Sequence, residues 1–311
     1  MRLAKTALSR HTRPMETQRD IVCIGSVLWD VIGRSGAVMR VGSDVPGRIT
    51  RLPGGVAMNI AMTSRRFSLR PVLLTAIGRD EEGDELIAAA ARLGMEIGYV
   101  YRSDDLPTDV YMAVEGANGL IAAIADAHSL EAAGGKILRP MSDGRLGDQT
   151  APYTGLVALD GNLTEELLAD IAKSPLFASA DLRVAPASPG KAERLLPLMP
   201  CPNATIYVNL EEAGYLCQAS FATAAEAVHA MLDRGAANVL VTDGGKAAAH
   251  GSAEGVLTAQ PPQVLVTRVT GAGDTFMAAH IAAQARGEAP DLALRTALKA
   301  AADYVSGDVR S

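Results

Sequence analysis

Cysteine and aromatic residues are both scarce in this chain of 311 residues, which has three cysteines and 4% aromatic residues. The cysteines, Cys23, Cys201 and Cys217, form no Cys-x-x-Cys pair, and their wide spacing is not that of a disulfide framework. The five histidines are scattered without the spacing of a zinc site. We therefore expect a protein of the reducing cytoplasm that contains no transition metal.

Long apolar runs and a surplus of basic residues are also lacking. No run of about eighteen apolar residues occurs, so no membrane-spanning helix is predicted. The 29 Lys and Arg residues are outnumbered by 35 Asp and Glu, and the net charge is -6, so no overall positive field would hold nucleic acid. Any phosphate must be bound locally. Residues 1–19 carry five basic residues and one acidic residue, and we expect them to form a flexible tail.

Two common phosphate-binding motifs are missing as well. The chain contains no Gly-x4-Gly-Lys-Ser/Thr sequence, and its first predicted strand lacks Gly-x-Gly-x-x-Gly. These absences disfavour a Walker-type NTPase and a dinucleotide-binding dehydrogenase.

Strand-like and helix-like segments alternate along most of the chain. The pattern predicts strands at 20–31, 72–77, 155–159, 204–208 and 238–242. It predicts helices at 58–67, 81–93, 164–173, 222–234, 278–286 and 291–305. Such alternation favours an α/β fold with a mostly parallel sheet that helices cover on both faces.

Two other segments have short strand patterns of their own. They lie near 43–53 and 108–126, and Asn118-Gly119 in the second is typical of a hairpin turn. We predict that both belong to a small antiparallel sheet inserted into one domain that spans residues 20–311.

The stretch Val266–Ala283, VTRVTGAGDTFMAAHIAA, predicts a strand that ends at Thr270, a turn of small residues and a helix that starts near Asp274. Such a turn places unpaired backbone N–H groups at the positive end of a helix dipole, where they can hold a phosphate. The Asp274 carboxylate could accept the proton of a hydroxyl group that attacks this phosphate. Capping of the helix is the alternative role for Asp274.

Three motifs occur in order along the chain: LPGGVAMNIA at Leu52–Ala61, AIGRDEEGDELI at Ala76–Ile87 and RVTGAGDTF at Arg268–Phe276. Together they resemble the ribokinase-like, or PfkB, family of carbohydrate and nucleoside kinases, and the similarity runs from about Asp20 to Val305. The resemblance implies a three-layer α/β/α ribokinase-like fold with a small β-sheet lid. It also implies that a sugar hydroxyl receives the γ-phosphate of ATP in the presence of Mg²⁺.

The resemblance further implies roles for particular residues. Asp274 would be the catalytic base, and the developing negative charge would be held by the amides of Gly271, Ala272 and Gly273. The sugar hydroxyls would be held by Asp30, Gly54, Gly55 and Asn59. The nucleotide would be contacted by Asn209, Thr242, Gly244, Gly271 and Gly273, and Glu212 would position Mg²⁺ through water. The alternative roles are a strand-end turn for Asp30, a polar helix position for Asn59 and a helix N-terminus for Asn209 and Glu212.

Several segments are similar to the pseudouridine kinase branch of this family. They are Val269-Thr270 before the GAGD motif, AIADAHS at 123–129, LDGNLTEE at 159–166 and PASPGK at 186–191. The likeness places Asp126 over the nucleoside, Asn162 near its base or ribose and Lys191 on the phosphate or substrate side. Thr108, like Asn162 and Asp126, could supply a polar partner for the uracil ring. A hairpin-end charge, a turn residue and a solvated lysine are the alternative roles of Asp126, Asn162 and Lys191.

The resemblance has a departure at the site of the monovalent cation. Arg268 and Val269 stand where most members carry an Asp-Thr pair that helps to coordinate a monovalent cation, so the usual K⁺ site is in doubt. The function implied is phosphorylation of the 5′-hydroxyl of pseudouridine by a homodimer that pairs through the lid. Two alternatives remain, namely a kinase of ribose, adenosine or another sugar or nucleoside, and a degenerate member that only binds a nucleoside.

Overall fold

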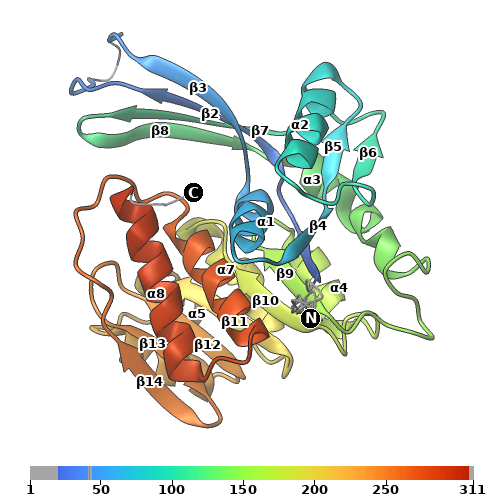
Figure 1. The fold of residues 1–311 in the computed structure, drawn as a ribbon, viewed down its shortest axis with the longest axis vertical. Coiled ribbons are helices and arrows are strands. Elements are labelled where there is room, and N and C mark those ends of the chain that lie inside the picture. Colours follow the sequence, from blue (N-terminus) through green and yellow to red (C-terminus); the bar gives the residue numbers. More distant parts are fainter. Residues whose placement is uncertain (1–19, 41, 43, 308–311) are drawn as a thin grey trace, which may run out of the picture.

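The computed structural model describes residues 20–307 except 41 and 43, and the predicted tail at 1–19 lies outside the described residues (Figure 1). Its centre is an eight-stranded sheet with the order β14-β13-β12-β11-β10-β9-β1-β4. The strands are β1 (Asp20–Ile24), β4 (Arg70–Leu74), β9 (Leu156–Asp160), β10 (Asp181–Ala185), β11 (Ala204–Asn209), β12 (Asn238–Thr242), β13 (Ala248–Ser252) and β14 (Gly255–Ala259). Neighbours from β4 to β12 are parallel, and β13 and β14 are antiparallel.

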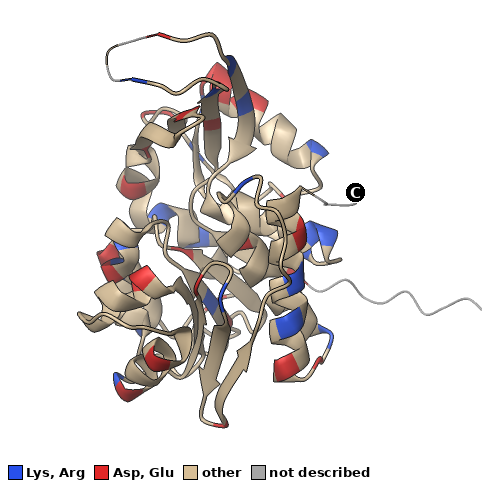
Figure 2. Ribbon diagram, turned by 90° about the vertical axis from the view of Figure 1, so that its left-hand side faces the viewer, with Lys and Arg blue, Asp and Glu red and all other residues tan. Residues whose placement is uncertain are grey.

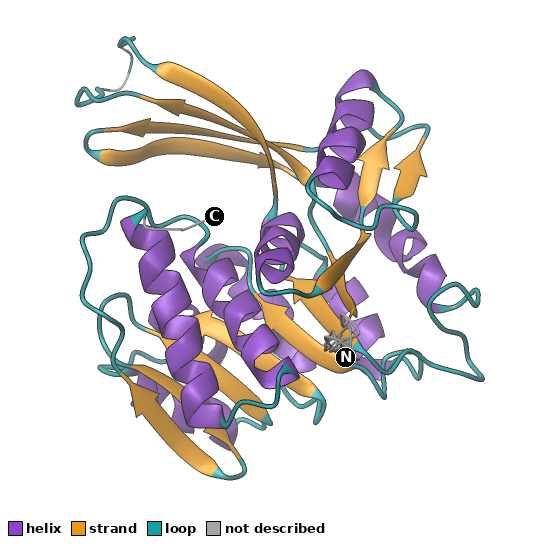
Figure 3. Cartoon of the chain, viewed as in Figure 1, coloured by secondary structure: helices purple, strands orange, loops and turns teal. Residues whose placement is uncertain are grey.

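Helices cover both faces of this sheet (Figure 3). One face carries α1 (Val56–Arg66), α2 (Glu81–Arg92), α7 (Ala272–Ala285) and α8 (Pro290–Ser306). The other carries α3 (His128–Ala133), η1 (Gly134–Met141), α4 (Glu165–Lys173), η2 (Pro189–Leu198), α5 (Leu210–Cys217) and α6 (Ala224–Asp233). Alternate residues of β1 enter opposite cores, because Ile21 and Cys23 face the first group of helices and Val22 and Ile24 the second. The predicted three-layer α/β/α fold is confirmed.

A second sheet stands above α1 (Figure 1). It has the order β3-β2-β7-β8 and consists of β2 (Leu28–Arg34), β3 (Arg48–Gly54), β7 (Val110–Gly116) and β8 (Gly119–Asp126). The predicted hairpin at Asn118-Gly119 joins β7 to β8, and Gly119 has a φ of 93° that suits glycine. The sheet is mixed and not purely antiparallel, because β2 runs parallel to β7. A pair of short strands, β5 (Ala76–Gly78) and β6 (Tyr101–Ser103), lies beside α2.

Two predicted strands are divided in the structure. The segment 20–31 leaves the main sheet after Ile24 and enters the small sheet at Leu28. The bend occurs at Gly25, which has a φ of 149°, and a Cβ at this position would collide with the side chain of Asp160. Similarly, 72–77 is split between β4 and β5.

The strand predicted to end at Thr270 does not form. Residues 260–269 contain no strand, and the amides of Thr267 and Arg268 donate to the carbonyl of Val305 at 2.8 and 3.3 Å. The segment thus follows the C-terminal end of α8, whose free carbonyls satisfy amides that a neighbouring strand would otherwise bind. A run of β-branched residues favours extended backbone, but it does not predict whether a neighbouring strand or the end of a helix will accept the hydrogen bonds of its amides.

Acidic and basic residues are interspersed over the side of the molecule drawn in Figure 2. Among the described helices, none combines the length and the apolar character needed to cross a bilayer.

Candidate active site

Asp274 lies in the first turn of α7, where the two most informative motifs of the sequence meet. Asn59 in the first turn of α1 donates from Nδ2 to Asp274 Oδ2 at 3.1 Å, although 215 positions separate the two residues. The structure therefore brings together the predicted base and one residue of the predicted sugar site.

Burial raises the pKa of Asp274 to about 7. The negative charges of Asp160, Asp30 and Glu212 contribute to this rise, whereas the hydrogen bond from Asn59 opposes it. A carboxylate with a pKa close to neutral pH can take up and release a proton under ordinary conditions, which is the property of a general base.

The turn before Asp274 has the geometry of an anion site. Gly271 adopts a φ of 87°, which favours glycine, and a Cβ there would displace the Tyr304 hydroxyl, 2.6 Å away. A Cβ at Gly273 would meet no atom within 4 Å, so the space beside this residue is open to a ligand. The first amides of a helix have no partners along the helix, but that of Ala272 donates to the carbonyl of Val269 at 3.0 Å.

Arg268 and Tyr304 fix this turn against the C-terminal end of α8. Arg268 Nε donates to the Tyr304 carbonyl at 2.7 Å, and its guanidinium lies 4.0 Å from the centre of the Tyr304 ring. The Tyr304 hydroxyl donates to the carbonyl of Thr270 at 2.9 Å. Sequence reasoning missed Tyr304, because a tyrosine near the end of a helix carries no sign of a partner 34 positions away.

The predicted sugar site lies at the junction of β2, β3 and α1. Burial raises the pKa of Asp30 to about 6, and a Cβ at Gly54 would collide with the Asp30 carboxylate. Gly55 has a φ of 93°, and a Cβ there would lie 2.5 Å from the Ser26 carbonyl oxygen. Gly54 thus leaves room for Asp30, and Gly55 lets the start of α1 approach Ser26. Asp30 and Asn59 both lie near Asp274.

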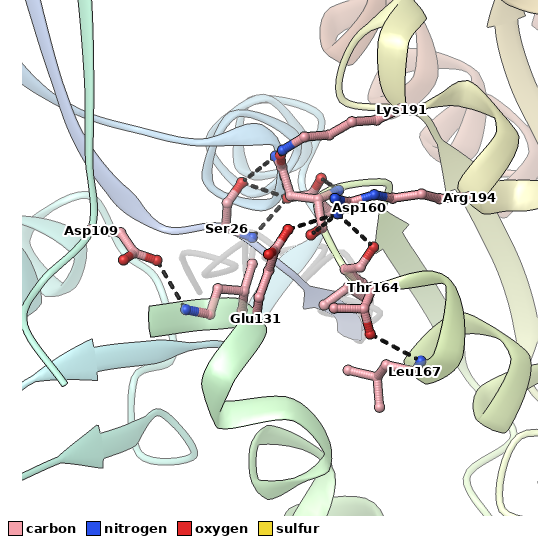
Figure 4. A network of polar contacts seen from close by, with 11 residues as sticks. Ser26, Asp109, Glu131, Asp160, Thr164, Leu167, Lys191 and Arg194 are labelled. Carbon is pink, nitrogen blue, oxygen red and sulfur yellow. Dashed lines mark hydrogen bonds and ion pairs between the residues drawn. The ribbon is translucent and has the colours of Figure 1, made fainter. Parts of the chain in front are cut away.

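Asp160, a fully buried residue that sequence reasoning missed, connects these parts (Figure 4). Its Oδ2 accepts hydrogen bonds from the amide and the hydroxyl of Ser26 at 2.7 and 2.5 Å. The same hydroxyl accepts the amide of Val56, the first residue of α1, at 2.9 Å. One buried carboxylate at the end of β9 thereby holds the bend between β1 and β2 and the helix that carries Asn59. Like Asp30, Asp160 follows an apolar strand pattern, and this signal could have found it.

Asn162 and Lys191 extend this network, and Figure 4 labels Lys191 and Arg194 on its far side from Asp109. Asn162 Nδ2 donates to the Ser26 hydroxyl at 3.1 Å, and Lys191 Nζ donates to Asn162 Oδ1 at 2.7 Å. Burial lowers the pKa of Lys191. Arg194 on η2 binds Glu131 on α3 at 2.9 Å and the Asn162 carbonyl at 3.0 Å. Asn162, predicted to contact the nucleoside, and Lys191, predicted to lie on the phosphate or substrate side, are therefore neighbours. Their contacts with a ligand stay predictions.

Asn209 and Glu212 form a reciprocal capping box at the start of α5. The Glu212 amide donates to Asn209 Oδ1 at 2.9 Å, and Glu212 Oε2 accepts the Asn209 amide at 2.8 Å. Burial raises the pKa of Glu212 to about 7. Its negative charge also contributes to the raised pKa of Asp274, so the cap acts electrostatically on the candidate base.

A cavity of about 230 Å³ adjoins the turn at Gly273. Thr242, Gly244 and Gly245 form one part of its wall, and apolar residues form most of the rest, namely Pro261, Pro262, Val264, Val266, Val269, Ala272, Phe276, Leu298, Ala301, Ala302 and Val305. A Cβ at Gly244 would meet no atom within 4 Å. The combination of an apolar pocket and an amide-rich turn suits the base and the phosphates of a nucleotide.

Two predicted substrate residues have other partners in the structure. Thr108 is buried and donates through its amide and hydroxyl to Asp80, the N-cap of α2, at 2.7 and 2.5 Å. Asp126 is exposed, and its Oδ1 forms a hydrogen bond with His128 Nδ1 at 2.7 Å.

Among the described residues, no group of three or more His, Cys, Asp or Glu side chains is arranged to hold a metal ion.

The sequence model of the family described as "pfkB family carbohydrate kinase" matches residues 18–306. The chain belongs to this family. Two curated relatives are called pseudouridine kinase: that of Arabidopsis thaliana is 26% identical over 175 residues, and that of Escherichia coli strain K12 is 34% identical over 77 residues. The matches cover 56% and 25% of this chain, and they span only 44% and 25% of these relatives.

Solved structures show the same fold. A carbohydrate kinase from Agrobacterium tumefaciens is 22% identical and superposes with a TM-score of 0.77, over 94% of both chains. The Arabidopsis thaliana ribokinase complexed with ribose and ATP is 20% identical and superposes with a TM-score of 0.72, again over 94% of both chains. The ribokinase-like fold expected from the sequence is therefore confirmed.

The raised pKa of Asp274 predicts a pH-dependent effect of Asp274→Asn on stability. The folded-state pKa of about 7 lies above the ordinary value of about 3.9, so ionisation of Asp274 destabilises the fold as the pH rises through this interval. Because asparagine does not ionise, the melting temperature of the variant relative to the unmodified protein should be higher at pH 8 than at pH 5. Asp170→Asn, at an exposed aspartate of α4, is the control. An equal difference at both pH values would contradict the prediction.

Proposed function

We propose that this protein is an ATP-dependent kinase that transfers the γ-phosphate to the 5′-hydroxyl of pseudouridine. The observation that carries the proposal is the contact of Asn59 with Asp274 beside an open, amide-lined turn at the edge of an apolar cavity. A base, an anion site and an adjoining pocket for the phosphate donor are the parts that phosphoryl transfer to an alcohol requires.

In the proposed reaction, Asp274 accepts the proton of the acceptor hydroxyl. The hydroxyl oxygen forms a bond to the γ-phosphorus, the bond from this phosphorus to the bridging oxygen breaks, and ADP leaves with the electron pair. The amides of Gly271 and Gly273 would stabilise the charge on the transferred group. The Ala272 amide could join them only after its hydrogen bond to Val269 opens.

Glu212 has the chemistry to hold Mg²⁺ through water. Its carboxylate is near Asp274, and the capping box engages its Oε2, which leaves Oε1 as a second acceptor. Magnesium keeps several waters and needs few carboxylates, so a site without a cluster of protein ligands is compatible with it. The metal would neutralise phosphate charge. Arg268, a fixed cation beside the turn, supports a kinase that does not depend on K⁺.

Pseudouridine is proposed as the acceptor for two reasons. The two curated relatives are named for it, and Asn162 and Lys191 place an amide and an ammonium group next to the Ser26–Asp160 network. A kinase of another sugar or nucleoside is the second candidate, because Thr108 and Asp126, the residues expected to read the uracil ring, have partners elsewhere. A nucleoside sensor would have no use for a base beside an anion site.

A phosphorylation panel with pseudouridine, uridine, adenosine, ribose and fructose tests the acceptor. We expect turnover with pseudouridine, and Asp274→Asn should lower it by about 10² to 10⁴-fold, because the general base is lost. Pseudouridine binding by the variant, measured by calorimetry, should persist. Turnover of free sugars alone would refute the nucleoside assignment, and undiminished turnover by Asp274→Asn would refute the role of this residue.

We further propose that the protein is a homodimer that pairs through the small sheet. On one face of this sheet, Ile49, Met112 and Ile124 are 76%, 48% and 65% exposed, and Met112 and Ile124 are direct cross-strand neighbours. Apolar side chains gathered on one sheet face are typical of an interface.

Sedimentation tests the proposed dimer. The protein should sediment at twice the 32.3 kDa of the chain, and Ile124→Glu should shift it to the monomer, because a charge would be buried in the interface. Leu292→Glu, at a 50% exposed position of α8, is the control and should leave the dimer intact. A monomer at micromolar concentration would refute the pairing.

Cys23, Cys201 and Cys217 are all free thiols and buried. Unpaired cysteines are the usual state in a reducing environment, which supports the proposal that the protein works in the cytoplasm.

A further inference from the structure

A second cavity, of about 280 Å³, lies between the β5–β6 pair and η1. Five basic residues line it, namely Arg79, Arg102, Lys136, Arg139 and Arg145, and its lining contains no acidic residue. We call this cavity the basic cleft. It shares no residue with the nucleotide cavity, whose walls come from β12, α7, α8 and the segment before α7.

The five basic residues converge from separate segments of the chain. Arg79 follows β5, Arg102 lies in β6, and Lys136 and Arg139 lie in η1. In a 3-10 helix, side chains three positions apart lie directly above one another, so Lys136 and Arg139 share one face of η1. The two-strand pair and the helix thus direct charges of one sign into the same space.

Arg102 is held in place by hydrogen bonds within the protein. Its guanidinium donates to the carbonyl of Gly78 at 2.6 Å and to Asp84 at 2.7 Å, and only 19% of the side chain is exposed. An arginine that is held in place can bind a ligand without losing much conformational freedom.

Two tyrosine rings also line the basic cleft. Lys136 Nζ lies 5.6 Å from the centre of the Tyr101 ring, and the Arg145 guanidinium lies 5.9 Å from that of Tyr99. Cation–π contacts of this length orient the cations. The Arg145 guanidinium also donates from Nε and Nη2 to Asp143, so Nη1 is the part of it that faces no carboxylate.

The charges in the basic cleft are only partly balanced. Arg79, Arg102 and Arg145 pair with Asp104, Asp84 and Asp143, all outside the lining. Lys136 and Arg139 form no salt bridge within the part of the chain that the structure describes. The pKa of Asp105 is lowered mainly by a hydrogen bond from the Ser103 hydroxyl, and the charge of Lys136 makes a smaller contribution. Because the chain as a whole has a net charge of -6, the excess of positive charge in the basic cleft is a local feature.

We propose that the basic cleft binds a small molecule that carries phosphate groups. Arginine forks and a lysine point charge are the donors that phosphate oxygens accept most strongly. A triphosphate and a nucleoside monophosphate share this chemistry, and either could be the ligand. The site is independent of the proposed kinase reaction, since none of its residues belongs to the candidate active site.

Calorimetric titration without Mg²⁺ tests the basic cleft, with inorganic tripolyphosphate and uridine monophosphate as separate probes. Lys136→Glu/Arg139→Glu should weaken the binding of the preferred probe by about tenfold or more, because two charge-assisted contacts are lost. Arg92→Glu/Lys173→Glu, at basic residues in the last turns of α2 and α4, changes the net charge equally and should retain binding.

Circular dichroism of both double variants verifies that they fold. Tighter binding of tripolyphosphate would assign the basic cleft to a triphosphate, and tighter binding of uridine monophosphate would assign it to a monophosphate. No binding by the unmodified protein, or equal losses in the two double variants, would overturn the proposal. A protein that binds the probe but phosphorylates no acceptor would refute the kinase function and leave the basic cleft intact.

Discussion

The contact between Asn59 and Asp274 is the interaction on which the candidate active site depends. A carboxylate at this position is partly withdrawn from water and lies near three other acidic side chains, and both effects raise its pKa. The hydrogen bond from Asn59 limits this shift and orients the carboxylate. The parallel sheet makes the contact possible, because it places the N-terminal ends of α1 and α7 together above the carboxyl ends of its strands (Figure 1).

Asp160 gives this arrangement its rigidity. It is completely buried, and Ser26 and Asn162 share its two oxygens. Because the Ser26 hydroxyl also binds the first amide of α1, the position of Asn59 is linked to the end of β9 and not only to its own helix. Buried polar groups are costly unless all of them have partners, so this network specifies one arrangement of the site. Arg268 and Tyr304 do the same for the opposite wall, at the turn before Asp274.

Local patterns were sufficient to predict most of the fold. The alternation of apolar strands and amphipathic helices predicted the covered parallel sheet, and the Asn118-Gly119 turn predicted the β7–β8 hairpin. Asp274 and Asn59 could be identified because each lies in a short motif, GAGD and GGVAMN, that resembles the family's. Tyr304 could not, because its partner Thr270 lies 34 positions away. The strand pattern before Asp160 marks its position, but not its partner Ser26, which lies 134 positions away. The bend at Gly25 and the missing strand before Gly271 have the same origin, since contacts distant in sequence decide both.

Direct titration of Asp274 is the most decisive measurement. Carboxyl carbon NMR of the ligand-free protein, assigned by comparison with Asp274→Asn, should give a midpoint of about 7 for this residue. Asn59→Ala should move the midpoint to higher pH, because the hydrogen bond that favours the charged form is lost. A midpoint near the ordinary value of about 4, or one that Asn59→Ala leaves unchanged, would contradict the account of Asp274 as a base that Asn59 holds.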